Sequence, residues 1–107
     1  MDTVTDARLW GREITLKNRY SVKLTLKGSH TRTGILERIG DRTGTLMMTG
    51  EVIPGTQCFI RVNIGEEELY SRAQVLAVDS GHVILLLENG LALFRKILRN
   101  NALQEPS

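Results

Sequence analysis

The chain has 107 residues, 41% of them hydrophobic and 24% charged, and a formal net charge of +2. This length allows one hydrophobic core, and the composition is that of a globular domain, which excludes a disordered tail. Its longest apolar run, Val83 to Leu87, is far shorter than the roughly 20 residues of a membrane-spanning helix. A single cysteine, Cys58, excludes an internal disulfide and a thiolate metal cluster. Met1 to Thr5 carries no basic region and no apolar region follows, so we expect no secretory signal and a cytoplasmic location.

Charge is distributed unevenly along the chain. Residues 1–50 hold nine Lys and Arg against five Asp and Glu, whereas residues 51–107 hold five against seven. An anionic ligand would favour the earlier part, although a solvated surface explains the same excess.

Alternating apolar and polar residues predict a first strand at Ser21–Lys27, with Val22, Leu24 and Leu26 on its buried side. A predicted turn at Gly28–Thr31 follows. Further β-rich runs lie at residues 32–39, 45–49, 56–64, 69–78 and 82–87, separated by Gly, Pro, Asp and Ser. The last of these runs is almost wholly apolar, so we expect it to be central.

The final element is predicted to be a helix. Helical spacing relates Leu91, Phe94, Ile97 and Leu98. Asn89 is the candidate N-cap, and residues 100–101 are the predicted exit. The expected fold is therefore mainly β, a six-stranded antiparallel β-barrel with a C-terminal α-helix that closes one end. The expected organisation is a flexible N-terminal segment at 1–16, the barrel and helix at 17–101, and a polar tail at 102–107.

The order of these features resembles the PilZ-domain family over roughly Lys17 to Asn100. The resemblance rests on the turn Ile53-Pro54-Gly55-Thr56, the two long strands after it, the turn Asp79-Ser80-Gly81, and a last strand that leads into the helix. It implies a PilZ-like barrel in a bacterial signalling protein, with cyclic di-GMP as a candidate ligand. In that family, affinity for this ligand is attributed to an RxxxR segment ahead of the first strand and a D/NxSxxG motif between the second and third strands.

The basic motif has its nearest match in Arg19 and Lys23, which keep the spacing but replace the second arginine by lysine. A guanidinium grips phosphate or a guanine edge through a planar fork, whereas an ammonium group is a hydrated point charge. The resemblance therefore implies weakened binding here. A solvated strand side accounts for both residues about as well.

The second motif is matched by Asp41 and Thr43, but Leu46 stands where the family has glycine. Placing Gly44 at the glycine position puts Ile39 where the acid should be. A leucine side chain would obstruct the close approach that glycine permits. Turn chemistry alone also explains Asp41 and Gly44.

Three functions follow as hypotheses. The preferred one is a non-enzymatic PilZ-like adaptor that binds a bacterial protein partner in motility, pilus or exopolysaccharide control, with nucleotide binding weakened or lost. The alternative is a cyclic di-GMP receptor in which Arg19 and Lys23 are carried on the flexible N-terminal segment and close over the nucleotide against Asp41 and Thr43. A barrel that binds single-stranded RNA ranks third, because no aromatic platform is apparent in the sequence.

Catalysis and metal binding are not expected. No paired carboxylates, Ser/His/Asp set or phosphate-binding glycine loop can be assembled from these residues. His30 and His82 have no sequence neighbours at ligand spacing and are interpreted as surface residues. Cys58 falls on the predicted buried side of its strand, where we expect an inert thiol.

Overall fold

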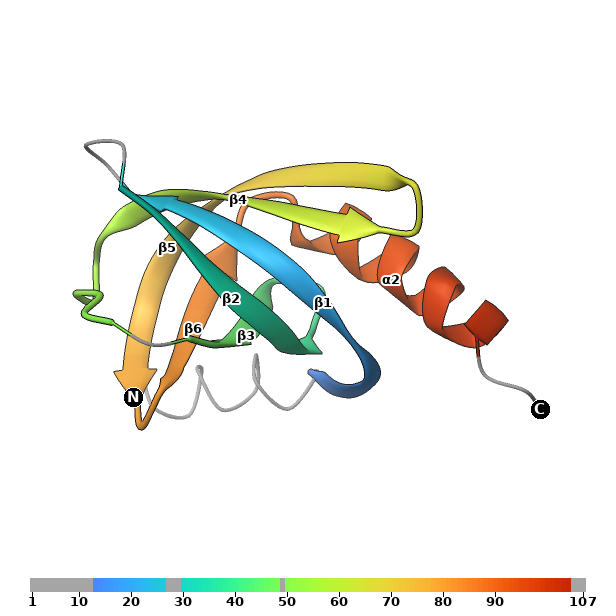
Figure 1. The fold of residues 1–107 in the computed structure, drawn as a ribbon, viewed down its shortest axis with the longest axis horizontal. Helices are drawn as coiled ribbons and strands as arrows, with labels where there is room; N and C mark the ends of the chain where they lie inside the picture. The colour runs from blue at the N-terminus through green and yellow to red at the C-terminus, as the bar shows by residue number, and fades with distance from the viewer. Residues whose placement is uncertain (1–12, 27–29, 49, 105–107) are drawn as a thin grey trace.

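The computed structural model describes residues 13–26, 30–48 and 50–104, and it contains six strands followed by one helix (Figure 1). In chain order the elements are β1 (Ile14–Leu26), β2 (His30–Ile39), β3 (Thr43–Met47), β4 (Gln57–Ile64), β5 (Glu67–Asp79), β6 (His82–Leu87) and α2 (Gly90–Gln104). The described part of the chain has no helix whose length and apolarity would allow it to cross a bilayer.

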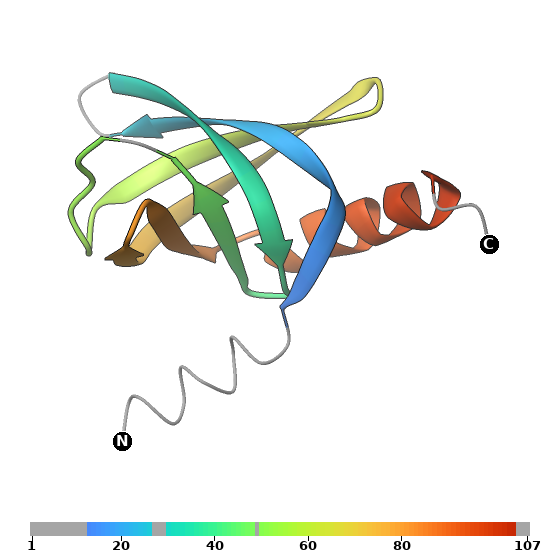
Figure 2. The same ribbon diagram turned by 60° about the horizontal axis from the view of Figure 1, so that its bottom comes forward.

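The strands close into an antiparallel barrel in the order β1-β2-β3-β6-β5-β4. Figure 2 shows β1, β2 and β3 next to one another on one side of this barrel. Closure gives every strand two hydrogen-bonded neighbours, which removes the exposed edges of an open sheet. The predicted fold class, a six-stranded antiparallel barrel with a C-terminal helix, is confirmed.

The core follows from the alternation seen in the sequence. On β4, Cys58, Ile60, Val62 and Ile64 face inward, and β1 contributes Val22 and Leu24 to the same interior. On β5 the alternation holds as far as Val75, where the register with β6 shifts before Ala77. Each of these side chains leaves water on folding, which supplies most of the favourable free energy.

Several strands begin earlier than the sequence predicts. β1 begins at Ile14, whereas the predicted strand began at residue 21. The prediction missed the earlier residues because the polar Asn18 interrupts the apolar alternation, although Leu16 and Tyr20 are buried. β3 begins at Thr43, whereas the predicted strand began at residue 45. The prediction missed Thr43 because a polar residue gives no sequence signal of burial, although Thr43 is buried in the structure. β2 begins at His30, inside the predicted turn, and residues 27–29 and 49 of the predicted elements lie outside the described residues.

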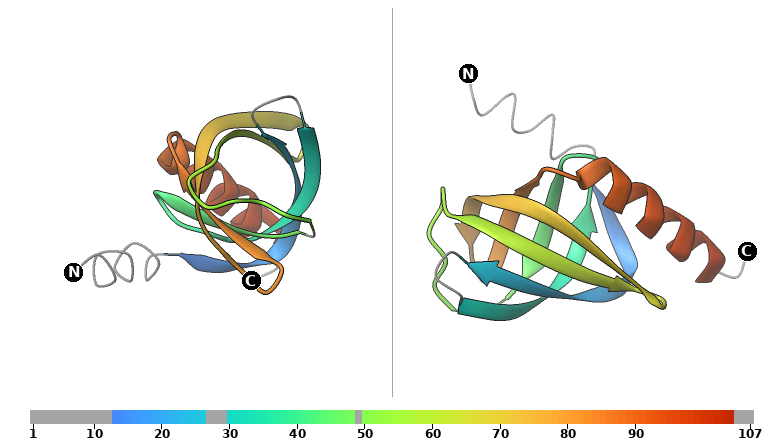
Figure 3. Two further views of the ribbon diagram at one scale, coloured as in Figure 1. Left: turned by 90° about the vertical axis from the view of Figure 1, so that its left-hand side faces the viewer. Right: turned by 90° about the horizontal axis from the view of Figure 1, so that it is seen from above.

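The helix covers one end of the barrel, and the left-hand view of Figure 3 looks along the barrel with α2 behind it. Its buried side chains are Leu93 and Ile97, with Phe94 packed against the core, whereas Leu91 and Leu98 are exposed. Of the four residues that helical spacing relates, Phe94 and Ile97 therefore face the barrel and Leu91 and Leu98 do not.

The start of α2 makes a close backbone contact with the barrel. A Cβ atom on Gly90 would lie 2.6 Å from the carbonyl oxygen of Asp41, so the start of α2 lies directly against the β2–β3 turn. The helix continues to Gln104, beyond the predicted exit, because residues 100–104 contain neither glycine nor proline.

Candidate functional site

The candidate site lies on the outer face of the barrel, over β2, β3 and β6. A β-bulge in β2 leaves Glu37 without a partner between the pairs Leu36–Leu46 and Arg38–Thr45. The bulge brings Arg38 opposite Thr45 on the outer face, and Ile84 of β6 lies on the other side of Thr45. The result is a pocket of about 320 Å³ between these strands and the β5–β6 turn, lined by Glu13, Glu37, Arg38, Thr45, Asp79, Ser80, His82 and Ile84.

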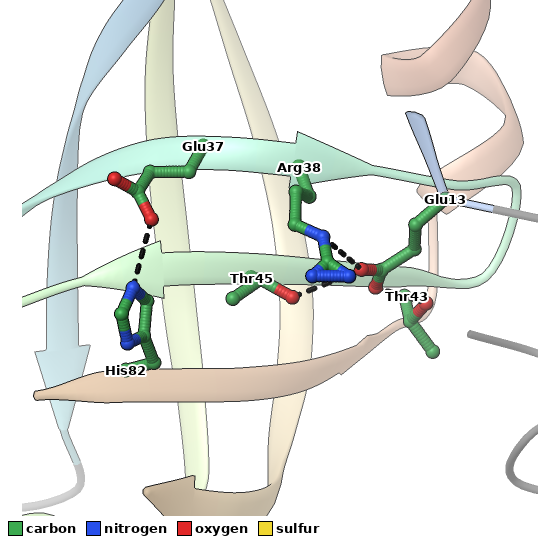
Figure 4. A network of polar contacts seen from close by, with 6 residues as sticks. All are labelled: Glu13, Glu37, Arg38, Thr43, Thr45 and His82. Atoms are coloured by element: carbon green, nitrogen blue, oxygen red, sulfur yellow. Dashed lines mark hydrogen bonds and ion pairs between the residues drawn. The ribbon is translucent and has the colours of Figure 1, made fainter. Parts of the chain in front are cut away.

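Glu13 reaches this face from the residue just before β1 (Figure 4). The hydroxyl of Thr43 donates a hydrogen bond of 2.5 Å to its Oε2, and the hydroxyl of Thr45 donates one of 2.9 Å to its Oε1. Arg38 Nε lies 3.8 Å from the same Oε1. The Glu13 side chain is only 2% exposed. These three groups therefore compensate the free-energy cost of removing its charge from water.

Glu37 forms a second cluster at the other end of the pocket. Its Oε1 lies 2.9 Å from His82 Nε2, and its Oε2 lies 3.3 Å from Arg19 Nη1. The Glu37 side chain is 14% exposed, whereas His82 and Arg19 remain largely in solvent. His82 is thus held against a carboxylate of β2 that lies 45 residues earlier in the chain, a partner that sequence spacing did not reveal.

The structure places the predicted basic pair in the barrel wall. Arg19 and Lys23 both belong to β1, and Lys23 pairs with Thr33 of β2 and Arg61 of β4. Four residues of an extended strand span about 13 Å, so the two cations do not converge on one phosphate. They form part of the hydrogen-bonded sheet, not of a segment ahead of it, because the buried alternation extends back through Tyr20 and Leu16.

The predicted acidic motif is split between three environments. Asp41 lies in the β2–β3 turn, beside a second pocket of about 550 Å³ that Arg42 and Arg72 also line. Thr43 is fully buried beneath the Glu13 carboxylate. Gly44 faces the barrel interior, where an added Cβ would lie 3.4 Å from Ile39, Leu36 and Leu87. Gly44 therefore serves core packing. Of the five predicted residues, Thr43 hydrogen-bonds Glu13 in Figure 4, and Arg19 pairs with Glu37.

Sequence reasoning missed the two carboxylates that organise the site, Glu13 and Glu37. Glu13 precedes the first strand and has no periodic pattern around it, and its partner Thr43 lies 30 residues away. Glu37 sits at the bulge, where the alternation of the strand breaks. Neither residue carries a local signal, because both roles depend on which strands become neighbours.

The predicted burial of Cys58 is confirmed. Burial raises the pKa of Cys58 to about 11, and its Sγ lies 3.6 Å from the carbonyl oxygen of Ala73. Among the described residues, no cluster of three or more His, Cys, Asp and Glu side chains is arranged to hold a metal ion.

Comparison with known proteins relates the chain to others by fold. No family model matches it, and the comparison with curated proteins finds no match. Among solved structures, the PilZ domain of CeSA from a cellulose-synthesizing bacterium matches with a TM-score of 0.65 at 20% identity, covering 87% of this chain and 98% of that domain. The PilZ domain of YcgR from Escherichia coli, solved with c-di-GMP, matches with a TM-score of 0.68 at 14% identity, covering 86% of this chain and 89% of that one. The chain therefore has a PilZ-domain fold.

Proposed function

We propose that this chain is a non-enzymatic PilZ-like signalling domain that acts by binding another protein, in bacterial motility, pilus or exopolysaccharide control, and that its affinity for cyclic di-GMP is weakened or lost. The observation that supports this most is the Glu13 carboxylate lying on the hydroxyls of Thr43 and Thr45. Thr43 is the hydroxyl residue of the D/NxSxxG-like segment, so the chain's own anion takes the position of an incoming acceptor.

The Glu13 carboxylate would repel a phosphate that approached the hydroxyls of Thr43 and Thr45. Two unit negative charges about 4 Å apart repel by about 4 kcal/mol at the effective dielectric constant near a protein surface. Arg38 offsets part of this repulsion, but it lies 3.8 Å from Glu13 and is already engaged. A nucleotide would have to expel the carboxylate and leave it without its two hydroxyl donors, which costs further free energy.

The remaining motif residues are also engaged or misplaced for a ligand. Arg19 forms an ion pair with Glu37. Leu46, at the position of the family's glycine, is fully buried in the core and pairs with Leu36 and Val83. Restoring a receptor would therefore require more than one change.

A cyclic di-GMP receptor is the second candidate, favoured by the fold it shares with the YcgR PilZ domain that was solved with c-di-GMP. In that case Glu13 must withdraw from β3 when the nucleotide arrives, and Arg19 must exchange Glu37 for phosphate. Binding would then be coupled to movement of the segment before β1, a population shift with a free-energy cost.

Isothermal titration calorimetry of the full chain separates the two candidates. We expect no saturable heat with cyclic di-GMP at millimolar ligand, and none with GTP as the control nucleotide. Saturable binding in the micromolar range that is specific for cyclic di-GMP and lost in Arg19→Ala and Asp41→Ala would contradict the proposal and establish the receptor.

A further inference from the structure

A second outer face of the barrel combines aromatic and cationic side chains. It is formed by β1, β4 and β5, which lie side by side in the right-hand view of Figure 3. The register places two rows across these strands, one of Lys23, Arg61 and Tyr70 and one of Thr25, Phe59 and Arg72. We call these six residues the β1–β4–β5 face. It shares none of its residues with the Glu13 pocket.

The aromatic rings of this face are not core residues. Phe59 is 39% exposed and Tyr70 is 46% exposed, and their ring centroids lie 5.6 Å apart. Neighbouring positions on the inner side, such as Ile60 and Ser71, are buried, so the two strands direct both rings outward by strict alternation. Exposed aromatic pairs of this kind are typical of the centre of a protein interface.

Three cations, Lys23, Arg61 and Arg72, lie on this face. Arg19, Arg38 and Lys96 each form an ion pair with a glutamate. Within residues 13–26, 30–48 and 50–104, no ion pair joins Lys23, Arg61 or Arg72 to a carboxylate. The three cations therefore have no ion-paired carboxylate among the described residues, although Arg61 also interacts with the hydroxyl of Tyr70.

A hollow beside the rings would accept a side chain. It has a volume of about 330 Å³ and is lined by Phe59, Tyr70, Ser71, Arg72, Glu88 and Asn89. Glu88 is one of the residues that line it, and the hydroxyl of Tyr70 donates a 2.5 Å hydrogen bond to Glu68. Two carboxylates so close to the rings disfavour the continuous phosphate backbone of a nucleic acid, whereas a protein can place its charges and apolar groups separately.

On the basis of the proposed adaptor function, we propose that the β1–β4–β5 face is where the protein partner docks, and that the partner presents carboxylates around an apolar side chain. The apolar group packs on Phe59 and Tyr70, and the carboxylates pair with Arg61, Arg72 and Lys23. Complementary charge of this kind fixes register and speeds association.

Site-specific photocrosslinking in cells that naturally contain the chain tests this placement. The photoreactive residue p-benzoylphenylalanine is introduced at Thr25, within the face, and as controls at Ile53 and Leu98, which are exposed elsewhere. We expect a light-dependent protein adduct from Thr25 and none from the two controls.

The adduct is then tested for the expected chemistry. The crosslinked partner is purified and titrated with the wild type, with Arg61→Glu/Arg72→Glu, and with the control pair Arg95→Glu/Arg99→Glu on the exposed side of α2. We expect the first pair to weaken binding by at least about tenfold, and the control pair by less than about twofold. Lysines in place of the partner's acidic residues at the crosslinked site should restore its binding to the Arg61→Glu/Arg72→Glu variant. The milder pair Arg61→Gln/Arg72→Gln gives an intermediate loss if folding of the first pair is impaired.

Each other outcome has a distinct meaning. An adduct only from Ile53 or Leu98 overturns this docking face but leaves the adaptor function standing. An RNA adduct from Thr25 overturns the protein partner in favour of a nucleic acid. The absence of any protein adduct from all three positions contradicts both the docking face and the adaptor function.

Discussion

Thr43 donates a hydrogen bond of 2.5 Å from its hydroxyl to Glu13 Oε2, across 30 residues of sequence. This contact joins the residue just before β1 to the first residue of β3, two strands that are not neighbours in the barrel. It therefore holds the start of the described chain over the outer face of β3, at the hydroxyl residue of the D/NxSxxG-like segment.

A double-mutant cycle tests the strength of that contact. Thr43→Val should destabilise the barrel by about 1 to 3 kcal/mol, because the buried Glu13 carboxylate loses a donor. Glu13→Gln should cost a similar amount alone, and the two losses should be less than additive, since glutamine weakens the same interaction that Thr43→Val removes. Unfolding in urea measures all three variants. Thr33→Val, at an exposed position of β2, is the control and should change stability by less than about 0.5 kcal/mol. Fully additive losses would show that Glu13 and Thr43 do not interact in solution.

Gly90→Ala tests the close approach of α2 to the β2–β3 turn. In an unconstrained helix, alanine in place of glycine stabilises by roughly 1 kcal/mol. Here the added Cβ would meet the Asp41 carbonyl oxygen at 2.6 Å, so we expect a loss of about 1 to 3 kcal/mol instead. Thermal or urea unfolding gives the sign directly. A stabilised Gly90→Ala variant would mean that the helix starts farther from the turn.

Deprotonation of Cys58 is expected to lower the free energy of unfolding at alkaline pH. Burial raises the pKa of this thiol from an ordinary 9.0 to about 11. Because the folded thiol holds its proton more tightly than the unfolded one, its contribution is complete below pH 9 and is lost as the pH rises toward about 11. A shift of this size corresponds to about 2 to 3 kcal/mol.

The measurement compares the urea stability of the wild type and Cys58→Ala from pH 8 to pH 11. The variant should be less stable at pH 8, because it leaves a small cavity, but its stability should fall less steeply with pH. Parallel curves for the two proteins would rule out a buried thiol at this position.

Local pattern was enough to predict most of the fold. Alternation on the strand that carries Cys58, Ile60 and Val62 identified the buried face, and turn residues separated the strands correctly. The start of β1 was missed because the polar Asn18 breaks the apolar alternation. In the barrel wall Asn18 is half-buried, and the strand continues through it. The helix was predicted, but helical spacing alone did not separate the inward Phe94 and Ile97 from the exposed Leu91 and Leu98.

The candidate site was much less predictable from sequence. Thr43 was identified as a candidate binding residue, but nothing local indicated that Glu13 would cover it. The aromatic pair of the β1–β4–β5 face was also missed, because Phe59 and Tyr70 come together only through the pairing of β4 with β5. Contacts between distant residues depend on strand order and register, which periodicity along one strand does not specify.

In the proposed function Glu13 takes the place of the nucleotide, and an amide-resolved NMR titration with cyclic di-GMP examines this at the contact itself. The amide signals of Thr43 and Thr45 are followed in the wild type and in Glu13→Gln. We predict no saturable shift in the wild type at millimolar ligand. Any response should appear only in Glu13→Gln, where the carboxylate charge has been removed. Saturable shifts of both amides in the wild type at micromolar ligand would contradict the claim and show that the chain binds the nucleotide despite Glu13.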